Sequence, residues 1–159
     1  MIGISEQAIF EPAAGKVYVL SVDPGLTSGW ALGKYEAGRF AVSALGTLPA
    51  ENFLEVCRKL AYVIHHLIIE EPAARGTPGL HTYVGQILEA FHPSAKAGKL
   101  ELYKVPPGVW KQYPKKKVAD ATTELLGVQG VLNTPHVRDA MGLLAWWWIT
   151  TGREVLSDG

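Results

Sequence analysis

Val17–Asp23 (VYVLSVD) is a nearly continuous apolar run, and Pro24-Gly25 follows it with a predicted turn. A short apolar run of this kind is typical of a strand that is buried on both faces of a sheet. Two more strand-like runs come next, at residues 29–35 and 39–46, separated by the short turn Glu36-Ala37-Gly38. This spacing predicts a β-hairpin, so the first three strands are expected to be antiparallel neighbours.

The rest of the chain alternates between helical and strand-like patterns. Pro49 opens a predicted helix with one apolar face, and His66–Glu70 (HLIIE) is a short buried strand. Further helices are predicted over residues 80–97, 115–126 and 135–150, with another strand over residues 100–105. Thr134 as an N-cap and Pro135 at the first helical position mark the start of the last helix. The order predicts an α/β fold with a mixed five-stranded sheet, three strands antiparallel and two parallel, and helices on both faces.

The chain of 159 residues has the length of a single domain. Residues 1–16 are predicted to be an N-terminal extension, and residues 17–159 the folded domain.

The single cysteine, Cys57, excludes an intramolecular disulfide framework and a cysteine-based zinc cluster, and its apolar surroundings predict a core residue. Residues 141–149 form the longest strongly apolar run, which is too short for a membrane span of about 20 residues. Because no signal peptide is visible either, we expect a soluble, cytoplasmic protein with no membrane partner.

Three acidic residues stand out by their place in this pattern. Asp23 ends the first predicted strand, Glu70 ends the fourth, and Asp139 lies in the first turn of the last helix, three residues after His136. Residues three apart on a helix share a face, so His136 and Asp139 can point at one object. If the first and fourth strands are adjacent, Asp23 and Glu70 converge at the carboxyl edge of the sheet.

Each of these residues also has an ordinary structural explanation. Asp23 before Pro-Gly could be a turn former, and Glu70 with Glu71 could be a solvated strand end. The helix dipole favours Asp139 near a helix N-terminus without any metal, and a lone histidine such as His136 is more often a surface or core residue than a ligand. As a set, however, the carboxylates suit divalent cations, because they repel one another unless cations lie between them. Two ions about 3.5–4 Å apart could activate a water on one side of a phosphate and stabilise the leaving oxygen on the other.

The charge balance bears on nucleic-acid binding. The formal net charge is zero, with 15 basic and 15 acidic residues, whereas nucleic-acid-binding domains usually carry a basic excess. The segment of residues 111–117 (KQYPKKK) nevertheless concentrates Lys111, Lys115, Lys116 and Lys117. Such a run is usually a solvated helix start, but beside metal ions it would suit the phosphates of a DNA strand. Arg75, in a predicted loop, is a weaker candidate for DNA binding.

Together these motifs resemble those of RuvC-type Holliday junction resolvases, which belong to the ribonuclease H-like superfamily. The resemblance covers about residues 17 to 148. Asp23-Pro24-Gly25 followed by Gly29-Trp30 looks like the first-strand motif of the family, and Ile69-Glu70 looks like its fourth-strand glutamate. Gly85-Gln86 has the expected spacing on the next helix, and residues 136–140 (HVRDA) look like the closing motif.

The resemblance implies a ribonuclease H-like nuclease with two Mg²⁺ or Mn²⁺ ions per active site. Asp23 would bridge both ions, Glu70 would bind one of them, and His136 and Asp139 would complete the ligands. The implied reaction is hydrolysis of four-way DNA junctions by paired nicks that leave 5′-phosphate and 3′-hydroxyl ends. A homodimer would place one active site on each of two opposing strands, and no small-molecule cofactor is implied. The short, divergent chain looks more like a bacteriophage or mobile-element homologue, acting in a bacterial or phage-infected cell, than a housekeeping enzyme.

One departure and several alternatives remain open. The segment of residues 75–83 (RGTPGLHTY) does not resemble the phenylalanine-bearing stretch that follows the glutamate in bacterial resolvases, which leaves base preference at the cut open. The same metals would serve a ribonuclease H-like nuclease for flaps, RNA–DNA hybrids or structured RNA. A catalytically dead, junction-binding module is a further alternative. An actin-like kinase is disfavoured by the length of the chain and by the lack of a second glycine-rich phosphate loop.

Overall fold

β1 (Val17–Asp23) lies at the centre of a mixed five-stranded sheet with the order β3-β2-β1-β4-β5. The computed structural model describes residues 15–75, 78–127 and 134–157. On one side of β1 the antiparallel strands are β2 (Thr27–Glu36) and β3 (Arg39–Pro49), and on the other side the parallel strands are β4 (His66–Glu70) and β5 (Glu101–Val105). The predicted sheet is therefore confirmed, including the adjacency of the first and fourth strands.

The apolar run of β1 is explained by the two cores that it separates. Tyr18, Leu20 and Val22 point into one core, and Val19 points into the other. Side chains alternate between the two faces of a strand, so a strand covered on both faces needs apolar residues at nearly every position. β4 follows the same rule, with its residues almost all buried.

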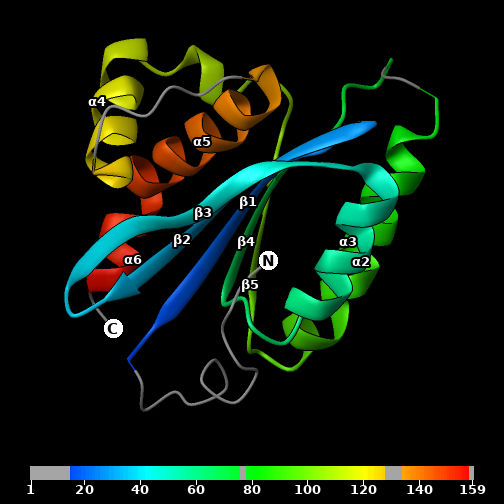
Figure 1. The fold of residues 1–159 in the computed structure, drawn as a ribbon, viewed down its shortest axis with the longest axis horizontal. Helices are drawn as coiled ribbons and strands as arrows, with labels where there is room; N and C mark the ends of the chain where they lie inside the picture. Colours follow the sequence, from blue (N-terminus) through cyan, green and yellow to red (C-terminus); the bar gives the residue numbers. More distant parts are fainter. Residues whose placement is uncertain (1–14, 76–77, 128–133, 158–159) are drawn as a thin grey trace.

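Helices cover both faces of the sheet, as predicted (Figure 1). α2 (Ala50–Leu60) and α3 (Leu80–Lys96) pack on one face, where Phe53, Cys57 and Phe91 are buried in the core. α4 (Lys115–Leu126) and α5 (Pro135–Trp147) cover the other face, which carries the second core. The buried position of Cys57 confirms its prediction as a core residue.

Several element boundaries differ from the predicted ones. β2 and β3 each extend further than expected at the end away from the hairpin, where Thr27 pairs with Pro49. At the hairpin, β2 runs on to Glu36, because the connection is a two-residue turn of Ala37 and Gly38 at φ 52° and 78°. Positive φ at both central residues gives the tight turn whose twist matches that of the flanking strands. The last predicted helix, over residues 135–150, ends at Trp147 instead and is followed by a π-helical turn (Trp148–Gly152) and the short helix α6 (Arg153–Ser157).

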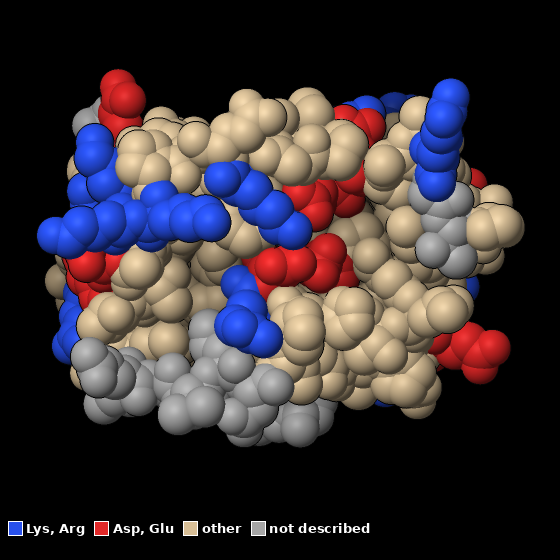
Figure 2. Space-filling model, turned by 90° about the horizontal axis from the view of Figure 1, so that it is seen from above, with Lys and Arg blue, Asp and Glu red and all other residues tan. Residues whose placement is uncertain are grey.

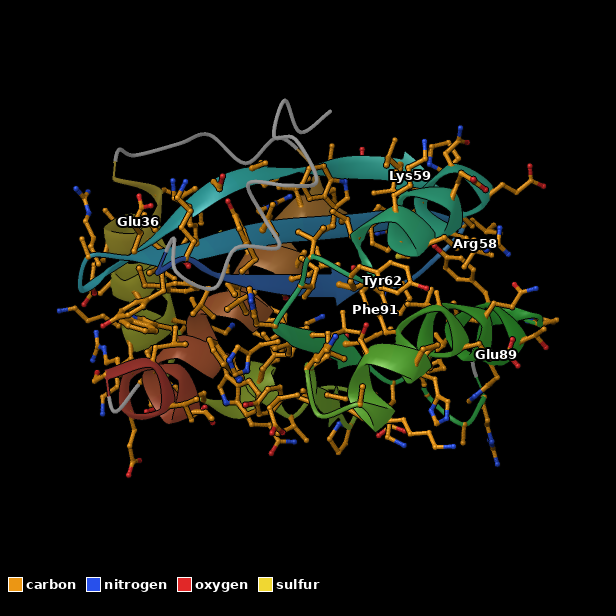
Figure 3. All side chains as sticks on the ribbon, turned by 90° about the horizontal axis from the view of Figure 1, so that it is seen from below. Glu36, Arg58, Lys59, Tyr62, Glu89 and Phe91 are labelled. Atoms are coloured by element: carbon orange, nitrogen blue, oxygen red, sulfur yellow. The ribbon has the colours of Figure 1, made fainter. Side chains whose placement is uncertain are left out.

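Figure 3 views the amino end of β1, where Arg58, Lys59 and Tyr62 are exposed at the end of α2 and beyond it. The predicted extension is mostly outside the described residues, apart from Gly15 and Lys16, whose ammonium lies 3.6 Å from the Glu36 carboxylate. Among the helices that are described, none has both the length and the apolar character of a membrane span.

Candidate functional site

Asp23 and Glu70 are the last residues of β1 and β4, and they lie at the same edge of the sheet. β1 and β4 run parallel with Val22 opposite Ile69, so Asp23 and Glu70 are the next residues of the two strands. The alternation of side chains puts Asp23 on the same face as Val19, and Glu70 on the same face as Ile68. Both Val19 and Ile68 belong to the core beneath α5. The two carboxylates therefore project toward the face of the sheet that α5 covers.

Three features hold the N-terminus of α5 against this edge. The side chain of Thr134 accepts a hydrogen bond from the Val137 N–H at 3.3 Å, which caps the helix. The buried hydroxyl of Ser21 on β1 donates to the Ala140 carbonyl at 2.8 Å. Gly29 on β2 lies so close to the His136 carbonyl that a Cβ atom there would overlap it. These contacts bring His136 and Asp139 to the carboxyl edge of β1.

The charges of Glu70 and Asp139 act on Asp23, whose side chain is only 17% exposed. Burial, together with the charges of Asp139 and Glu70, raises the pKa of Asp23 to about 6. The His136 imidazole, with Nδ1 at 3.5 Å from Asp23 Oδ2, opposes this shift and lowers the pKa. Figure 2 looks onto this end of the molecule and shows acidic side chains gathered near the centre of the face, with basic side chains beside them. The carboxylates of the site thus carry more negative charge than the neighbouring basic side chains neutralise.

Glu70 is oriented by two donors that the sequence analysis did not identify. The Gly108 backbone N–H and the Trp110 indole N–H both donate to the same carboxylate oxygen, Oε2, at 3.2 and 3.0 Å. Trp110 is buried, and its ring fills the space over Gly142 of α5, where a Cβ atom would overlap the ring. Because both donors use Oε2, they leave Oε1 of Glu70 for another partner. Glu71, the alternative to Glu70, donates its backbone N–H to the Val105 carbonyl at 2.7 Å.

The predicted basic residues have different positions relative to the carboxylates. The Lys111 ammonium lies 3.5 Å from Asp139 Oδ2 and 5.5 Å from the centre of the Trp110 ring, so Lys111 belongs to the site. Lys115, Lys116 and Lys117 are exposed in the first turn of α4, and the Lys117 ammonium lies over the Tyr113 ring at 6.0 Å. Arg75 is exposed in the segment after β4.

The donors have the chemistry of a site for a hard divalent cation, because carboxylate oxygens predominate and an imidazole is present. Among the described residues, however, no three His, Cys, Asp or Glu side chains are arranged so that they could hold a metal ion. His136 and Asp139, with side chains 46% and 34% exposed, are the members of the set least confined by packing. Ion binding would require these side chains to turn toward Asp23, and the positive charge of a bound cation would favour that movement by removing the repulsion between the carboxylates.

Comparison with known proteins gives a structural likeness only. No protein-family model and no curated protein matches this sequence. The structure of T. thermophilus RuvC in complex with a Holliday junction substrate superposes with a TM-score of 0.58 at 18% identity, over 86% of this chain and 97% of that chain. A second Thermus thermophilus RuvC structure gives the same TM-score and identity, over 86% of this chain and 98% of that chain. The manganese-soaked human cytomegalovirus terminase nuclease domain has a TM-score of 0.39 at 8% identity, over 87% of this chain and 86% of that chain, which is too distant to carry an argument. The likeness to RuvC shows that the chain has the ribonuclease H-like fold expected from its motifs.

Proposed function

We propose that this protein is a divalent-metal-dependent endonuclease that resolves four-way DNA junctions by paired nicks, leaving 5′-phosphate and 3′-hydroxyl ends. The observation that carries the proposal is the convergence of Asp23, Glu70 and Asp139 at one edge of the sheet, where burial and the charges of Asp139 and Glu70 raise the pKa of Asp23 to about 6. Uncompensated carboxylates of this kind are what a two-metal phosphodiesterase requires. The fold shared with a protein solved in complex with a Holliday junction supports the choice of substrate.

Asp23, Glu70, His136 and Asp139 are the proposed ligands of two Mg²⁺ or Mn²⁺ ions. When bound, the ions would lower the pKa of a bound water and stabilise the oxygen that leaves the scissile phosphate. Asp23 lies between Glu70 on β4 and the two α5 residues, which suits the proposed bridging role. The bonds from Gly108 and Trp110 hold the Glu70 carboxylate through Oε2, and its other oxygen, Oε1, would be available to an ion.

Basic residues at the same face would hold the DNA strand. Lys111 neutralises part of the charge of Asp139 in the present structure. With cations bound by the carboxylates, the Lys111 ammonium would be released to contact a phosphate of the scissile strand. Lys115, Lys116 and Lys117, and more weakly Arg75, would bind phosphates farther along the strand, which would contribute affinity without base preference.

The assembly is also part of the proposal. Paired nicks require two active sites related by a two-fold axis, so we propose that the protein acts as a homodimer on the pseudo-two-fold junction. Residues 17–159 would form the nuclease domain, and the reaction needs no small-molecule cofactor. Cleavage in a bacterial or phage-infected cytoplasm would match a mobile-element origin of the chain.

The proposal is tested with a labelled synthetic four-way junction, a flap, an RNA–DNA hybrid and a linear duplex at equal concentrations. Each is incubated with the protein and Mg²⁺, Mn²⁺ or a chelator. Symmetric, metal-dependent nicks in the junction alone, with ligatable 5′-phosphate ends, are the expected result. Equal or faster cutting of the flap or the hybrid would contradict junction resolution and favour another ribonuclease H-like nuclease. Tight junction binding without cleavage in either metal would instead favour a catalytically dead binding module.

A further inference from the structure

A pocket of about 280 Å³ opens beside the turn that follows Asp23. Its walls come from the turn between β1 and β2, the start of α2 and the first turns of α3. Leu26, at the tip of the turn, contributes to the lining although it is 82% exposed. A leucine this exposed next to a pocket is available to pack against an incoming ligand.

Hydrogen bonds hold the walls of this pocket in place. The Tyr83 hydroxyl of α3 and the buried Ser28 hydroxyl of β2 are 2.6 Å apart, and Ser28 also bonds to the Gly25 backbone. Burial raises the pKa of Tyr83 to about 12, which favours the neutral phenol that shares this bond. The Ala50 N–H donates to the Leu26 carbonyl at 2.9 Å, which ties the turn to the start of α2. The pocket is therefore preformed.

The lining combines apolar surfaces with a few polar groups. Leu54 and Leu80 add aliphatic surface to that of Leu26, and the Tyr83 ring adds an aromatic surface. The polar side chains are a carboxylate, Glu51, and an amide, Gln86. A flat ring with hydrogen-bonding groups on its edge matches such a lining, and unstacked nucleobases have this form.

The pocket is also close to the proposed cleavage site. Gly25 is two residues from Asp23, so their Cα atoms lie at most about 7.6 Å apart, because consecutive Cα atoms are about 3.8 Å apart. A stacked DNA strand rises about 3.4 Å per nucleotide. A strand with its phosphate at Asp23 therefore brings a base to the pocket within one or two nucleotides.

We propose that this pocket takes one unstacked nucleobase of the scissile strand and sets the base preference of the cut; this rests on the proposed function. Glu51 can accept a hydrogen bond from an exocyclic amine, and Gln86 can both donate and accept. Carboxylates accept from the cytosine amine and amides pair with adenine, whereas thymine offers no exocyclic amine. The pocket therefore favours adenine or cytosine over thymine.

Binding is tested with 2-aminopurine, which brightens when it leaves the stack, placed in turn at each position near the exchange point of a four-way junction. The measurement is made in chelator, so it does not depend on cutting. The wild-type protein is expected to brighten one position. The double variant Leu26→Ala/Glu51→Ala, which changes only exposed side chains, is expected to lose most of that signal. Glu55→Ala, one turn farther along α2 and also exposed, is the matched control and should brighten as the wild type does.

Base preference is then measured in Mg²⁺ by placing each of the four bases at the brightened position. Cleavage is expected to be about tenfold faster with adenine or cytosine than with thymine, and Glu51→Ala should remove this difference. Brightening that persists in the double variant, or no brightening although the junction is bound, would overturn the pocket and leave the nuclease proposal intact. A protein that binds no junction at all, by fluorescence anisotropy, would overturn both proposals.

Discussion

At the scale of single residues, Asp23 carries the electrostatic strain of the site. Its pKa of about 6, against an ordinary 3.8, means that the folded chain disfavours the charged form. We predict that Asp23→Asn raises the free energy of unfolding at pH 7, in chelator, by about 3 kcal/mol, since each pKa unit between 3.8 and about 6 corresponds to about 1.4 kcal/mol. Urea denaturation of both proteins provides the measurement. A variant less stable than the wild type under these conditions would show that Asp23 is a structural turn former.

Trp110 is predicted to position Glu70 for ion binding. Trp110→Phe keeps most of the ring over Gly142 but removes the indole N–H donated to Glu70 Oε2. Loss of such an outer partner should weaken Mn²⁺ binding by about tenfold. Isothermal titration calorimetry of Mn²⁺ measures the affinity apart from cleavage.

The control for this prediction is Trp148→Phe. Trp148 is as buried as Trp110, with 8% and 9% of each residue exposed, but its indole N–H has no partner among the described residues. This variant should lose stability through packing alone and keep the Mn²⁺ affinity of the wild type. Equal Mn²⁺ affinities in the two variants would show that Trp110 does not position Glu70.

Some residues of the site can be identified from the sequence and others cannot. Asp23 and Glu70 are predictable because they end apolar strands, and strand ends converge wherever the strands are parallel neighbours. Trp110 has no such signal, since its contact with Glu70 depends on the path of the chain after β5. The one sequence feature consistent with it is Gly142, which leaves room for the ring within an otherwise apolar helix. The ligand roles of the carboxylates and of His136 remain predictions.

At the scale of elements, the placement of α5 on β2 depends on Gly29. A Cβ atom there would overlap the His136 carbonyl, so Gly29→Ala should push the N-terminus of α5, with His136 and Asp139, away from Asp23. Overpacking of this kind costs about 1–3 kcal/mol. Thermal unfolding should show the loss of stability, and Mn²⁺ titration a loss of affinity.

Gly85→Ala is the matched control for this substitution. Gly85 lies within α3, and a Cβ atom there would have nothing within 4 Å. Alanine is favoured over glycine inside a helix by about 0.5–1 kcal/mol, so this variant should be slightly more stable than the wild type. Unchanged Mn²⁺ affinity in Gly29→Ala would contradict the role of this close contact.

Element types are predicted better than element ends. The alternation of apolar residues and the turn at Ala37-Gly38 define the hairpin, whereas its exact strand lengths depend on pairing between β2 and β3. The last helix shows the limit most clearly. The apolar pattern continues through Trp148, and nothing local distinguishes the π-helical turn of Trp148–Gly152 from further α-helix. The close contact of Gly152 with the Trp147 ring is a tertiary contact that the sequence does not reveal.

At the scale of the whole molecule, the raised pKa of Asp23 makes stability depend on pH and on metal. Between about pH 4 and 6 the folded state holds the Asp23 proton that the unfolded state has lost. The contribution of Asp23 to stability in chelator should therefore be largest below about pH 4. It should be lost as the pH rises through 6. Mg²⁺, which binds the ionised carboxylates, should raise the melting temperature more at pH 7.5 than at pH 5.

Thermal unfolding with and without Mg²⁺ across this pH range measures both effects. Asp23→Asn serves as the control and should show a smaller Mg²⁺ effect and a weaker dependence on pH. A Mg²⁺ effect as large in the variant as in the wild type would place the ion elsewhere.

The distribution of charge is a property of the whole molecule that composition does not convey. The net charge of zero counts against a nucleic-acid binder, yet the carboxylates gather at one place with basic residues beside them (Figure 2). The mixed sheet with helices on both faces was predictable from the order of strands and helices, whereas the ribonuclease H-like fold was predicted from the resemblance of the motifs. The position of Lys111 beside Asp139 follows only from how the segment between β5 and α4 packs against α5.

If Asp23, Glu70 and Asp139 form the catalytic metal centre of a nuclease, DNA cleavage must require both Asp23 and a divalent metal ion. The most direct measurement compares the wild type with Asp23→Asn on a labelled four-way junction, in Mg²⁺ and in chelator, with junction binding recorded for both proteins. We predict paired nicks by the wild type in Mg²⁺ only, and junction binding without cleavage by the variant. Cleavage by Asp23→Asn at the wild-type rate, or cleavage by the wild type in chelator, would contradict this prediction.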